Sequence, residues 1–375
     1  MLTRKVGATL AVALTLILST ASPAFAHGAD APDATNYRSA ITSTPALDGL
    51  EIRTIEAGAR LQLTNRTGRN IEVLGYQGEP YLEIRPDGVY ENFHSPATYL
   101  NITIAHVDPP AHADPTVPPV WNKVSDEPMY RWHDQRALWT SPQQPDVVRA
   151  DPGREHHLRD WTVPMRVDAT PLQLKGTLDW VPPGASWLWW LAAIGGGALL
   201  ALLGLTARPR VPLALLAIAA GAVGLVYAVG RELDAGYSSA LPILGQLFTA
   251  QLWNTVTSLV AIAAGIYALT KPKGDGDFAL ALGGAAVGLF AGMTNAAVFH
   301  RSITPLPWGT TTARLLVAAV IALGAGVAVA AMLRLRGTAP PPSEPAVLTA
   351  LPPAEPAVPT AAEPPAASAP PAPPA

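Results

Sequence analysis

Residues 161–206 have the sequence WTVPMRVDATPLQLKGTLDWVPPGASWLWWLAAIGGGALLALLGLT, within which the spacing of apolar residues changes. Up to Trp180, apolar and polar residues alternate in two runs separated by residues 168–170. Alternation of this kind is typical of paired β-strands with one buried face. From Trp187 the sequence is apolar for the length that crosses a bilayer, which is about 20 residues. The sequence therefore predicts a sheet domain that is followed, soon after Trp180, by membrane helices.

The apolar region continues to Leu333, and charged or proline-containing segments divide it into five predicted spans. These spans cover residues 187–206, 211–230, 247–270, 278–298 and 314–333. None of them has Asp, Glu, Lys or Arg in its middle. Because ion-coupled pumps and proton relays need ionisable groups there, we do not expect an active transporter. The prediction is an all-α bundle of five transmembrane helices at 187–333.

The basic residues predict the orientation of this bundle. One set of connections carries paired basic residues, namely Arg208 and Arg210, Lys271 and Lys273, and Arg334 and Arg336. The alternate loops carry single arginines at 231 and 301, with Arg314 at a helix edge. Since basic loops stay in the cytoplasm, the first set is predicted to be cytoplasmic. We therefore expect a multi-pass protein of the plasma membrane, with everything before Trp187 outside the cell and the C-terminus inside.

The N-terminus predicts export independently. Arg4 and Lys5 precede an apolar run at residues 6–18, and Ala24 and Ala26 supply the small residues that a signal peptidase needs. We predict a signal peptide at residues 1–26, although an uncleaved anchor would show a similar pattern. Cleavage after Ala26 would make His27 the first residue of the mature protein.

Further short alternating runs fill the segment that we assign to the exported domain, residues 27–184. They contain Leu61 and Leu63, Ile71 and Val73, Leu82 and Ile84, and Leu100, Ile102 and Ile104. Turn-forming sequences at 65–68 and 86–88 separate some of them. Short strands with such punctuation favour an all-β antiparallel sandwich of the immunoglobulin-like type.

The composition excludes several classes of function. The chain has 375 residues and no cysteine, which excludes disulfide scaffolds and thiol or iron–sulfur chemistry. Its net charge of −3 gives no electrostatic surface for nucleic acid. Residues 337–375 consist largely of Pro and Ala with a few Glu, and such a composition predicts a disordered cytoplasmic tail. The standard motifs of serine hydrolases, zinc proteases and P-loop enzymes are missing, so we expect a protein that is not an enzyme.

Several short motifs carry a resemblance to a known family. They are LGYQGEPYL at 74–82, PDGV at 86–89, SPATYLN at 95–101, YRWHD at 130–134 and DPGRE at 151–155. These motifs resemble those of exported multi-span membrane proteins of high-GC actinobacteria. The resemblance covers roughly residues 35–335 and implies an ectodomain ahead of several spans, without implying an activity.

A second resemblance concerns the predicted mature N-terminus. His27, followed by TSTPA at 42–46 and a β-domain, is similar to the CopC-type copper-binding domain. This resemblance implies a CopC-like sandwich and makes copper the expected metal, if one is bound.

Histidines are concentrated ahead of the spans, since only His300 among the eight lies later. Imidazole suits Cu(II) and Zn(II), and a terminal His27 would offer its amine as well as its ring. The candidate metal-site residues are His27, His94, His133, Asp134 and His156, with His157 as an alternative to His156. Neighbouring strand residues point to opposite faces, so His156 and His157 cannot both serve one site on a strand. The alternative interpretation is that these histidines are hydrogen-bonded surface or core residues.

The sequence thus leaves two functional hypotheses. In the first, the bundle anchors the sandwich in the lipid bilayer, and the sandwich binds an envelope partner or ligand through exposed aromatic residues. The aromatic candidates are Tyr76, Tyr81, Tyr90, Trp121, Trp132 and Trp139. In the second, the protein binds or handles copper, or another divalent metal, at the cell envelope.

Overall fold

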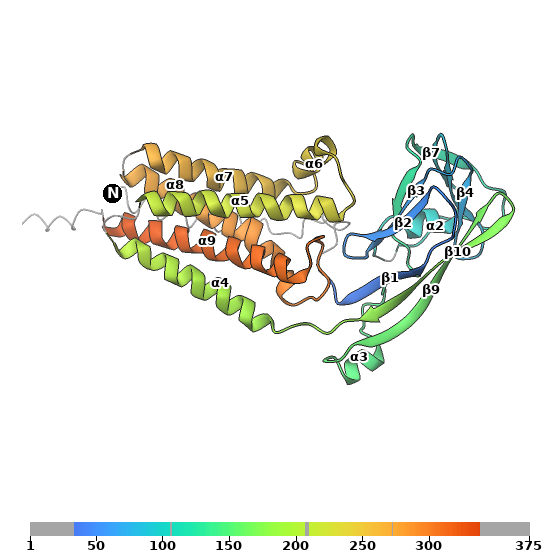
Figure 1. The fold of residues 1–375 in the computed structure, drawn as a ribbon, viewed down its shortest axis with the longest axis horizontal. Helices are drawn as coiled ribbons and strands as arrows, with labels where there is room; N and C mark the ends of the chain where they lie inside the picture. Colours follow the sequence, from blue (N-terminus) through green and yellow to red (C-terminus); the bar gives the residue numbers. More distant parts are fainter. Residues whose placement is uncertain (1–33, 106, 207–209, 272, 338–375) are drawn as a thin grey trace, which may run out of the picture. The chain divides into compact units, whose positions relative to one another are not determined.

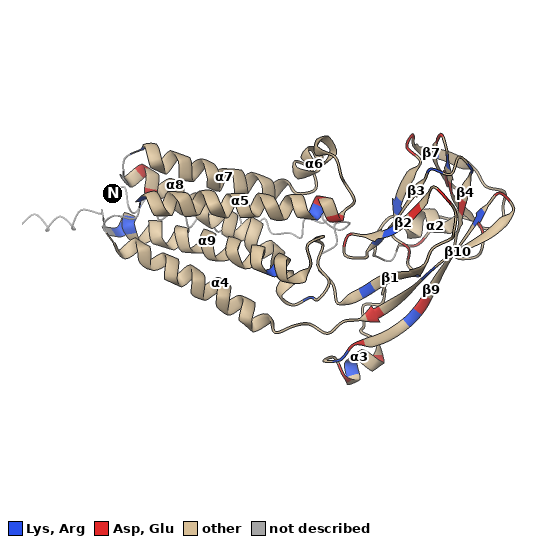
Figure 2. Ribbon diagram, in the orientation of Figure 1, with Lys and Arg blue, Asp and Glu red and all other residues tan. Residues whose placement is uncertain are grey.

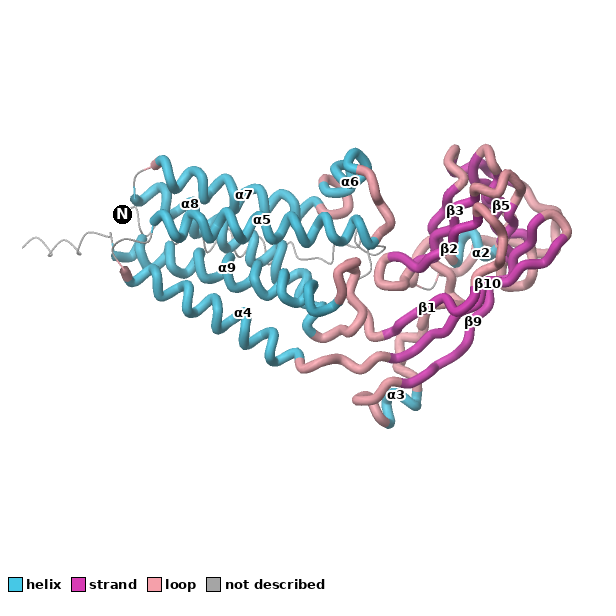
Figure 3. Tube along the Cα trace, in the orientation of Figure 1, coloured by secondary structure: helices cyan, strands magenta, loops and turns pink. Residues whose placement is uncertain are grey.

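The computed structural model describes residues 34–105, 107–206, 210–271 and 273–337 (Figure 1). The predicted signal peptide, His27 and the predicted tail beyond residue 337 lie outside the described residues. In the described part, a sheet domain comes first and a set of long apolar helices follows (Figure 3).

The strands of the sheet domain form two antiparallel sheets within the described residues. The larger sheet has the order β1-β10-β9-β4-β5-β6-β7, and the smaller one has the order β2-β3-β8. The strands are β1 Tyr37–Ser43, β2 Leu50–Ile55, β3 Arg60–Asn65, β4 Ile71–Leu74, β5 Pro80–Arg85, β6 Gly88–Asn92, β7 Trp121–Ser125, β8 Met129–Trp132, β9 His156–Val167 and β10 Thr170–Trp180. Two short helices, α2 Pro96–Leu100 and α3 Asp146–Ala150, lie in the connections.

The longest hairpin joins β9 to β10 and confirms the alternation seen in the sequence. Val167 pairs with Thr170, and the register continues to His156 opposite Trp180. Asp168 adopts a left-handed conformation in the two-residue turn, with φ of 52°. Alternate residues from Trp161 onward are buried, and their neighbours are mostly exposed, as a half-buried strand requires.

Both sheets contribute to one apolar core, which gives the domain its sandwich-like form. Leu61 and Leu63 of the smaller sheet are buried together with Val73, Ile84 and Val163 of the larger one. Since each fully buried aliphatic side chain contributes about 1.5–3 kcal/mol, this shared core holds the domain together without disulfides.

The strand expected from Leu100, Ile102 and Ile104 does not form. Ser95 instead caps α2, accepting a hydrogen bond from the backbone N–H of Ala97 at 3.2 Å, and Pro96 occupies the first turn. A capping serine followed by proline is a helix-start signal, and it overrides the short period-two pattern. Ile102 is consequently 60% exposed.

In the described part of the chain, five helices are long and apolar enough to cross a membrane. They cover Ser186–Leu205, Arg210–Asp234, Leu252–Thr270, Gly274–Phe299 and Thr310–Arg336. The elements are α4 Ser186–Ala201 with η1 Leu202–Leu205, α5 Arg210–Asp234, α7 Leu252–Thr270, α8 Lys273–Ala286 with η2 Val287–Gly292 and η3 Met293–Phe299, and α9 Thr310–Gly337. A shorter helix, α6 Ala240–Leu247, precedes α7. Charged residues lie toward the helix ends (Figure 2).

Glycines bring α8, and the segment η2 that continues it, into close contact with α9. A Cβ atom on Gly324 of α9 would lie 2.7 Å from the backbone nitrogen of Gly288 and 2.8 Å from the carbonyl oxygen of Gly284. No side chain therefore fits between the two helices here, which is the type of packing that small residues permit in membranes.

The polar face of α7 is turned into the bundle. Asn254, Thr255 and Ser258 are between 0% and 5% exposed. Gly221 and Gly224 of α5 lie against Ser258, and a Cβ atom on either would come within 2.3 Å of its atoms. These polar groups therefore face a neighbouring helix and not lipid.

The sheet domain is hydrogen-bonded to the loops at one end of the helices. Thr35 and Ile303 exchange two backbone hydrogen bonds of 2.8 Å. The carboxylate of Asp234, at the end of α5, accepts a hydrogen bond of 2.8 Å from the backbone N–H of Ala57, which lies in the turn between β2 and β3. The guanidinium of Arg131 lies 4.3 Å from the ring centre of Tyr237.

The turn that contacts Asp234 has a costly backbone conformation. Glu56 and Ala57 are consecutive non-glycine residues with φ of 55°. Each such residue costs on the order of 1 kcal/mol. Burial raises the pKa of the Glu56 carboxyl, an effect that the neighbouring Arg60 opposes. The hydrogen bond to Asp234 holds this turn in place.

We predict that Asp234→Ala exposes the amide of Ala57 to solvent. A hydrogen bond to a charged group contributes about 1.5–3 kcal/mol, so its loss should speed exchange of this amide by about tenfold or more. Hydrogen–deuterium exchange of the peptide around residues 55–60 measures the effect. Ala57→Gly, which tolerates the left-handed conformation, should keep the protection, and the exposed Asp48→Ala serves as control. Unchanged exchange in Asp234→Ala would contradict the role given to this contact.

Candidate functional site

One buried side chain organises the surface at the end of β6. Asn92 is 2% exposed, and its amide donates a hydrogen bond of 2.7 Å to the carbonyl of Pro80. Its side-chain oxygen accepts hydrogen bonds of 3.0 Å from the backbone N–H groups of His94 and Val120. Asn92 therefore fixes the end of β6 to the start of β7, with a long loop between them.

Aromatic side chains gather where this loop returns. The ring of Phe93 stacks on His112, with centres 4.2 Å apart and planes at 6°. Tyr99 meets His112 edge-on at 5.4 Å, and His94 lies 5.8 Å from Phe93 on a tilted plane. We call Phe93, His94, Tyr99 and His112 the Phe93 cluster.

Hydrogen bonds fix the members of the Phe93 cluster. The hydroxyl of Tyr99 donates to the carbonyl of Phe93 at 3.1 Å and lies 2.7 Å from Nε2 of His112. Because that hydroxyl has one hydrogen, Nε2 of His112 carries the proton that it shares with Tyr99. Partial burial raises the pKa of Tyr99 above its ordinary value. Nδ1 of His94 lies 2.9 Å from the carbonyl oxygen of Pro118.

The Phe93 cluster lies on the surface and outside the core. Phe93 is 39% exposed, and Val120 and Val117 nearby are 47% and 37% exposed. Aromatic side chains that are both exposed and held in place offer a surface for apolar contact, and the two imidazoles add hydrogen-bonding edges. This combination makes the Phe93 cluster the candidate functional site.

Of the predicted metal residues that the structure describes, only His94 belongs to the Phe93 cluster. His133 is 1% exposed, accepts a hydrogen bond of 2.9 Å from Nε of Arg60, and directs Nδ1 to the carbonyl oxygen of Ala59 at 2.9 Å. Asp134, equally buried, forms two 2.8 Å contacts with the guanidinium of Arg136. Both side chains therefore have structural partners in the interior.

His156 and His157 lie at the start of β9 and use their rings separately. Nε2 of His156 lies 2.6 Å from the carbonyl oxygen of Asp151. Nδ1 of His157 lies 2.9 Å from a carboxylate oxygen of Asp179 on β10. Among the residues that the structure describes, no three His, Asp or Glu side chains are grouped as a metal site. His27 lies outside those residues.

Sequence reasoning missed most of the Phe93 cluster. Phe93, Tyr99 and His112 were not among the candidates, whereas Tyr81 and Trp132, which were, are buried in the core. The available signal was the segment FHSPATY at 93–99, where a helix start lies between aromatic residues. Nothing in the sequence alone places His112 on Phe93, because a 19-residue separation carries no periodicity.

No protein-family model, no curated protein and no solved structure matches the chain.

We predict that removal of His133 lowers the free energy of unfolding, whereas removal of His94 does not. His133→Ala removes the partner of Nε of Arg60 and the imidazole that lies against the Ala59 carbonyl, so it should lower the free energy of unfolding by about 2–3 kcal/mol in the presence of a chelator. His94→Ala should change it by less than about 0.5 kcal/mol. Chemical unfolding of the full chain in detergent measures both.

A Cu(II) titration of the same variants completes this test. If copper is a ligand, affinity should fall in His94→Ala and in a mature chain extended by one residue before His27, and stay unchanged in His133→Ala. Binding that survives both of the first two changes would exclude the copper site.

Proposed function

We propose that the chain is a non-enzymatic membrane protein that displays its sheet domain outside the cell and binds a protein partner of the envelope through the Phe93 cluster. The observation that supports this proposal is an exposed aromatic cluster held by hydrogen bonds, from Tyr99 to Phe93 and from His94 to Pro118. Aromatic residues are enriched among those that contribute most to protein interfaces.

Preorganisation favours binding by this surface. Ordering a flexible side chain at an interface costs about 0.5–1.5 kcal/mol. Phe93 and Tyr99 are already ordered by their contacts with His112, so that cost is reduced. The buried Asn92 fixes the backbone beneath them. The five apolar helices serve as the anchor of this binding surface.

Copper binding is the second candidate function. It is supported by two imidazoles, those of His94 and His112, that pack on the same phenyl ring of Phe93. Two imidazoles leave positions open on Cu(II) or Zn(II), and His27 at a cleaved N-terminus would be a further ligand. The Cu(II) titration described above tests this candidate.

The placement of the sheet domain is tested with single cysteines, because the chain has none of its own. We expect Thr177→Cys, in β10, to react with a membrane-impermeant maleimide on intact cells, and Lys273→Cys, at the start of α8, to react only after the cells are opened. The reason is that the paired basic residues keep the α7–α8 connection inside. The reverse pattern would overturn the orientation.

Binding through the Phe93 cluster is tested by cross-linking. A photoreactive group is attached to Val120→Cys, beside the Phe93 cluster, or to Val147→Cys, on α3. Val120 and Val147 are both 47% exposed, so the two positions are matched. We expect one reproducible cross-linked protein from position 120 and none from position 147. Adding Phe93→Ala and Tyr99→Ala should reduce the product by about tenfold, since each aromatic anchor contributes more than about 1 kcal/mol. Equal products at both positions would contradict the proposal.

A further inference from the structure

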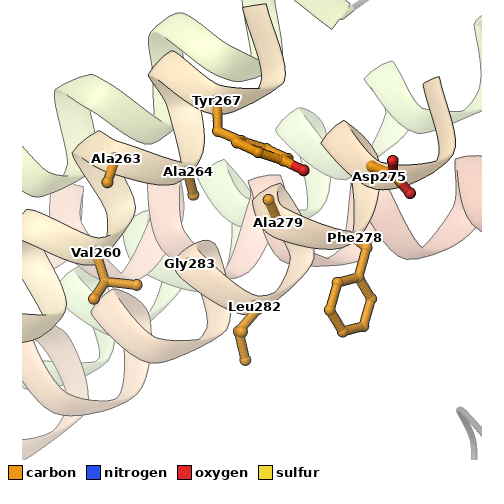
Figure 4. Close-up of a pocket in the computed structure, with 9 residues that line it drawn as sticks. All are labelled: Val260, Ala263, Ala264, Tyr267, Asp275, Phe278, Ala279, Leu282 and Gly283. Atoms are coloured by element: carbon orange, nitrogen blue, oxygen red, sulfur yellow. The ribbon is translucent and has the colours of Figure 1, made fainter. Parts of the chain in front are cut away.

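An apolar groove runs between α7 and α8 (Figure 4). Its volume is about 540 Å³. Val260, Ala263 and Ala264 of α7 line it, opposite Phe278, Ala279, Leu282 and Gly283 of α8. Leu282 is 56% exposed and Phe278 is 45% exposed, so the groove opens away from the other helices. In a bilayer, such an opening faces lipid.

The polar residues of the groove are all at one end. Tyr267 and Asp275 line it close to the turn that joins the two helices, and the hydroxyl of Tyr267 lies on the side of Asp275 (Figure 4). Lys271, in the same turn, has its Nζ atom 5.8 Å from the ring centre of Tyr267. Among the side chains that the structure describes, the groove therefore has an apolar body and, at its mouth, the carboxylate of Asp275 and the amine of Lys271.

The length of the groove matches one leaflet. From Val260 to Tyr267 the rise along α7 is about 10 Å, and from Asp275 to Gly283 along α8 it is about 12 Å. Half of the hydrocarbon core of a bilayer is about 15 Å thick. With the α7–α8 turn at the interface, the groove extends through most of the hydrocarbon of one leaflet.

The charges at the mouth are complementary to a zwitterion. Asp275 is exposed and forms no ion pair with any described residue, whereas Asp277 is buried in an ion pair with Arg334 at 2.9 Å. A carboxylate at the membrane interface favours a primary ammonium group, with which it forms a charge-assisted hydrogen bond. Lys271 favours a phosphate.

We propose that this groove is a binding site for an amino phospholipid of the phosphatidylethanolamine class. An acyl chain lies along Val260, Ala263 and Leu282, the phosphate lies at Lys271, and the ammonium group binds Asp275. Tyr267, whose ring is apolar and whose hydroxyl is polar, lies at the boundary between chain and headgroup.

An acyl chain is the occupant that this groove favours. The groove is apolar along its length, its polar residues lie only at one end, and its exposed side chains open it toward lipid.

Native mass spectrometry of the full chain, reconstituted with equal amounts of dioleoyl phosphatidylethanolamine, phosphatidylcholine and phosphatidylglycerol, tests the proposal. We expect the ethanolamine lipid to be retained with about a tenfold preference, as one charge-assisted hydrogen bond would give. Asp275→Asn should bring its retention down to that of the choline lipid. Ala263→Trp, which fills the groove from an exposed position, should remove the bound lipid of every class.

Ile266→Trp is the matched control, because Ile266 is a lipid-facing residue of α7, 53% exposed, that does not line the groove. Its lipid retention should equal that of the unmodified chain. Equal retention of the three headgroups, or equal effects of the two tryptophans, would overturn the proposal. A dimer that Ala263→Trp dissociates would overturn it as well, by making a second copy the occupant. A photoactivatable ethanolamine lipid, cross-linked to the unmodified chain, should label residues 260–283.

Discussion

The hydrocarbon of a bilayer offers no hydrogen-bond partner to a peptide group, and the remaining structure follows from this constraint. In the described part of the chain, each of the five long apolar segments closes its own backbone hydrogen bonds as a helix. Before Trp180, the backbone groups pair between strands, which leaves sheet edges such as β7 that require water. The five residues between β10 and α4 separate the part of the chain that pairs as strands from the part that closes its hydrogen bonds as helices.

Sequence patterns predicted the elements whose environment is uniform. The β9–β10 hairpin was predictable because one buried face imposes alternation along many residues. The five long helices were predictable because each is apolar over a length that crosses a bilayer. The predictions failed where a second local signal competed with the pattern of apolar residues. Ser95 and Pro96 start a helix where alternation suggested a strand. The change from α-helix to other helical forms after Ala286 has no counterpart in hydropathy.

The candidate site was predictable only in part, and the reason is its dependence on contacts between distant residues. His94 was selected for its chemistry. The second imidazole that packs on Phe93 belongs to His112, which comes from the far end of a loop. His133 was a candidate ligand only because imidazole binds metals and the histidines are concentrated ahead of the spans. Its actual partners are Arg60 on β3 and the carbonyl of Ala59, whose proximity only the pairing of β3 with β8 brings about.

The π-helical segment at Val287–Gly292 has a consequence for the tolerated length of its helix. A π-turn holds one residue more than an α-turn, and each residue rotates a helix by about 100°. Phe299, which follows this segment in the chain, is 0% exposed and lies 5.1 Å from Trp190. Loss of one residue anywhere in the segment would rotate Phe299 and Asn295 off their partners, although every side chain remained. This helix should therefore tolerate a conservative substitution in the segment better than the deletion of one residue.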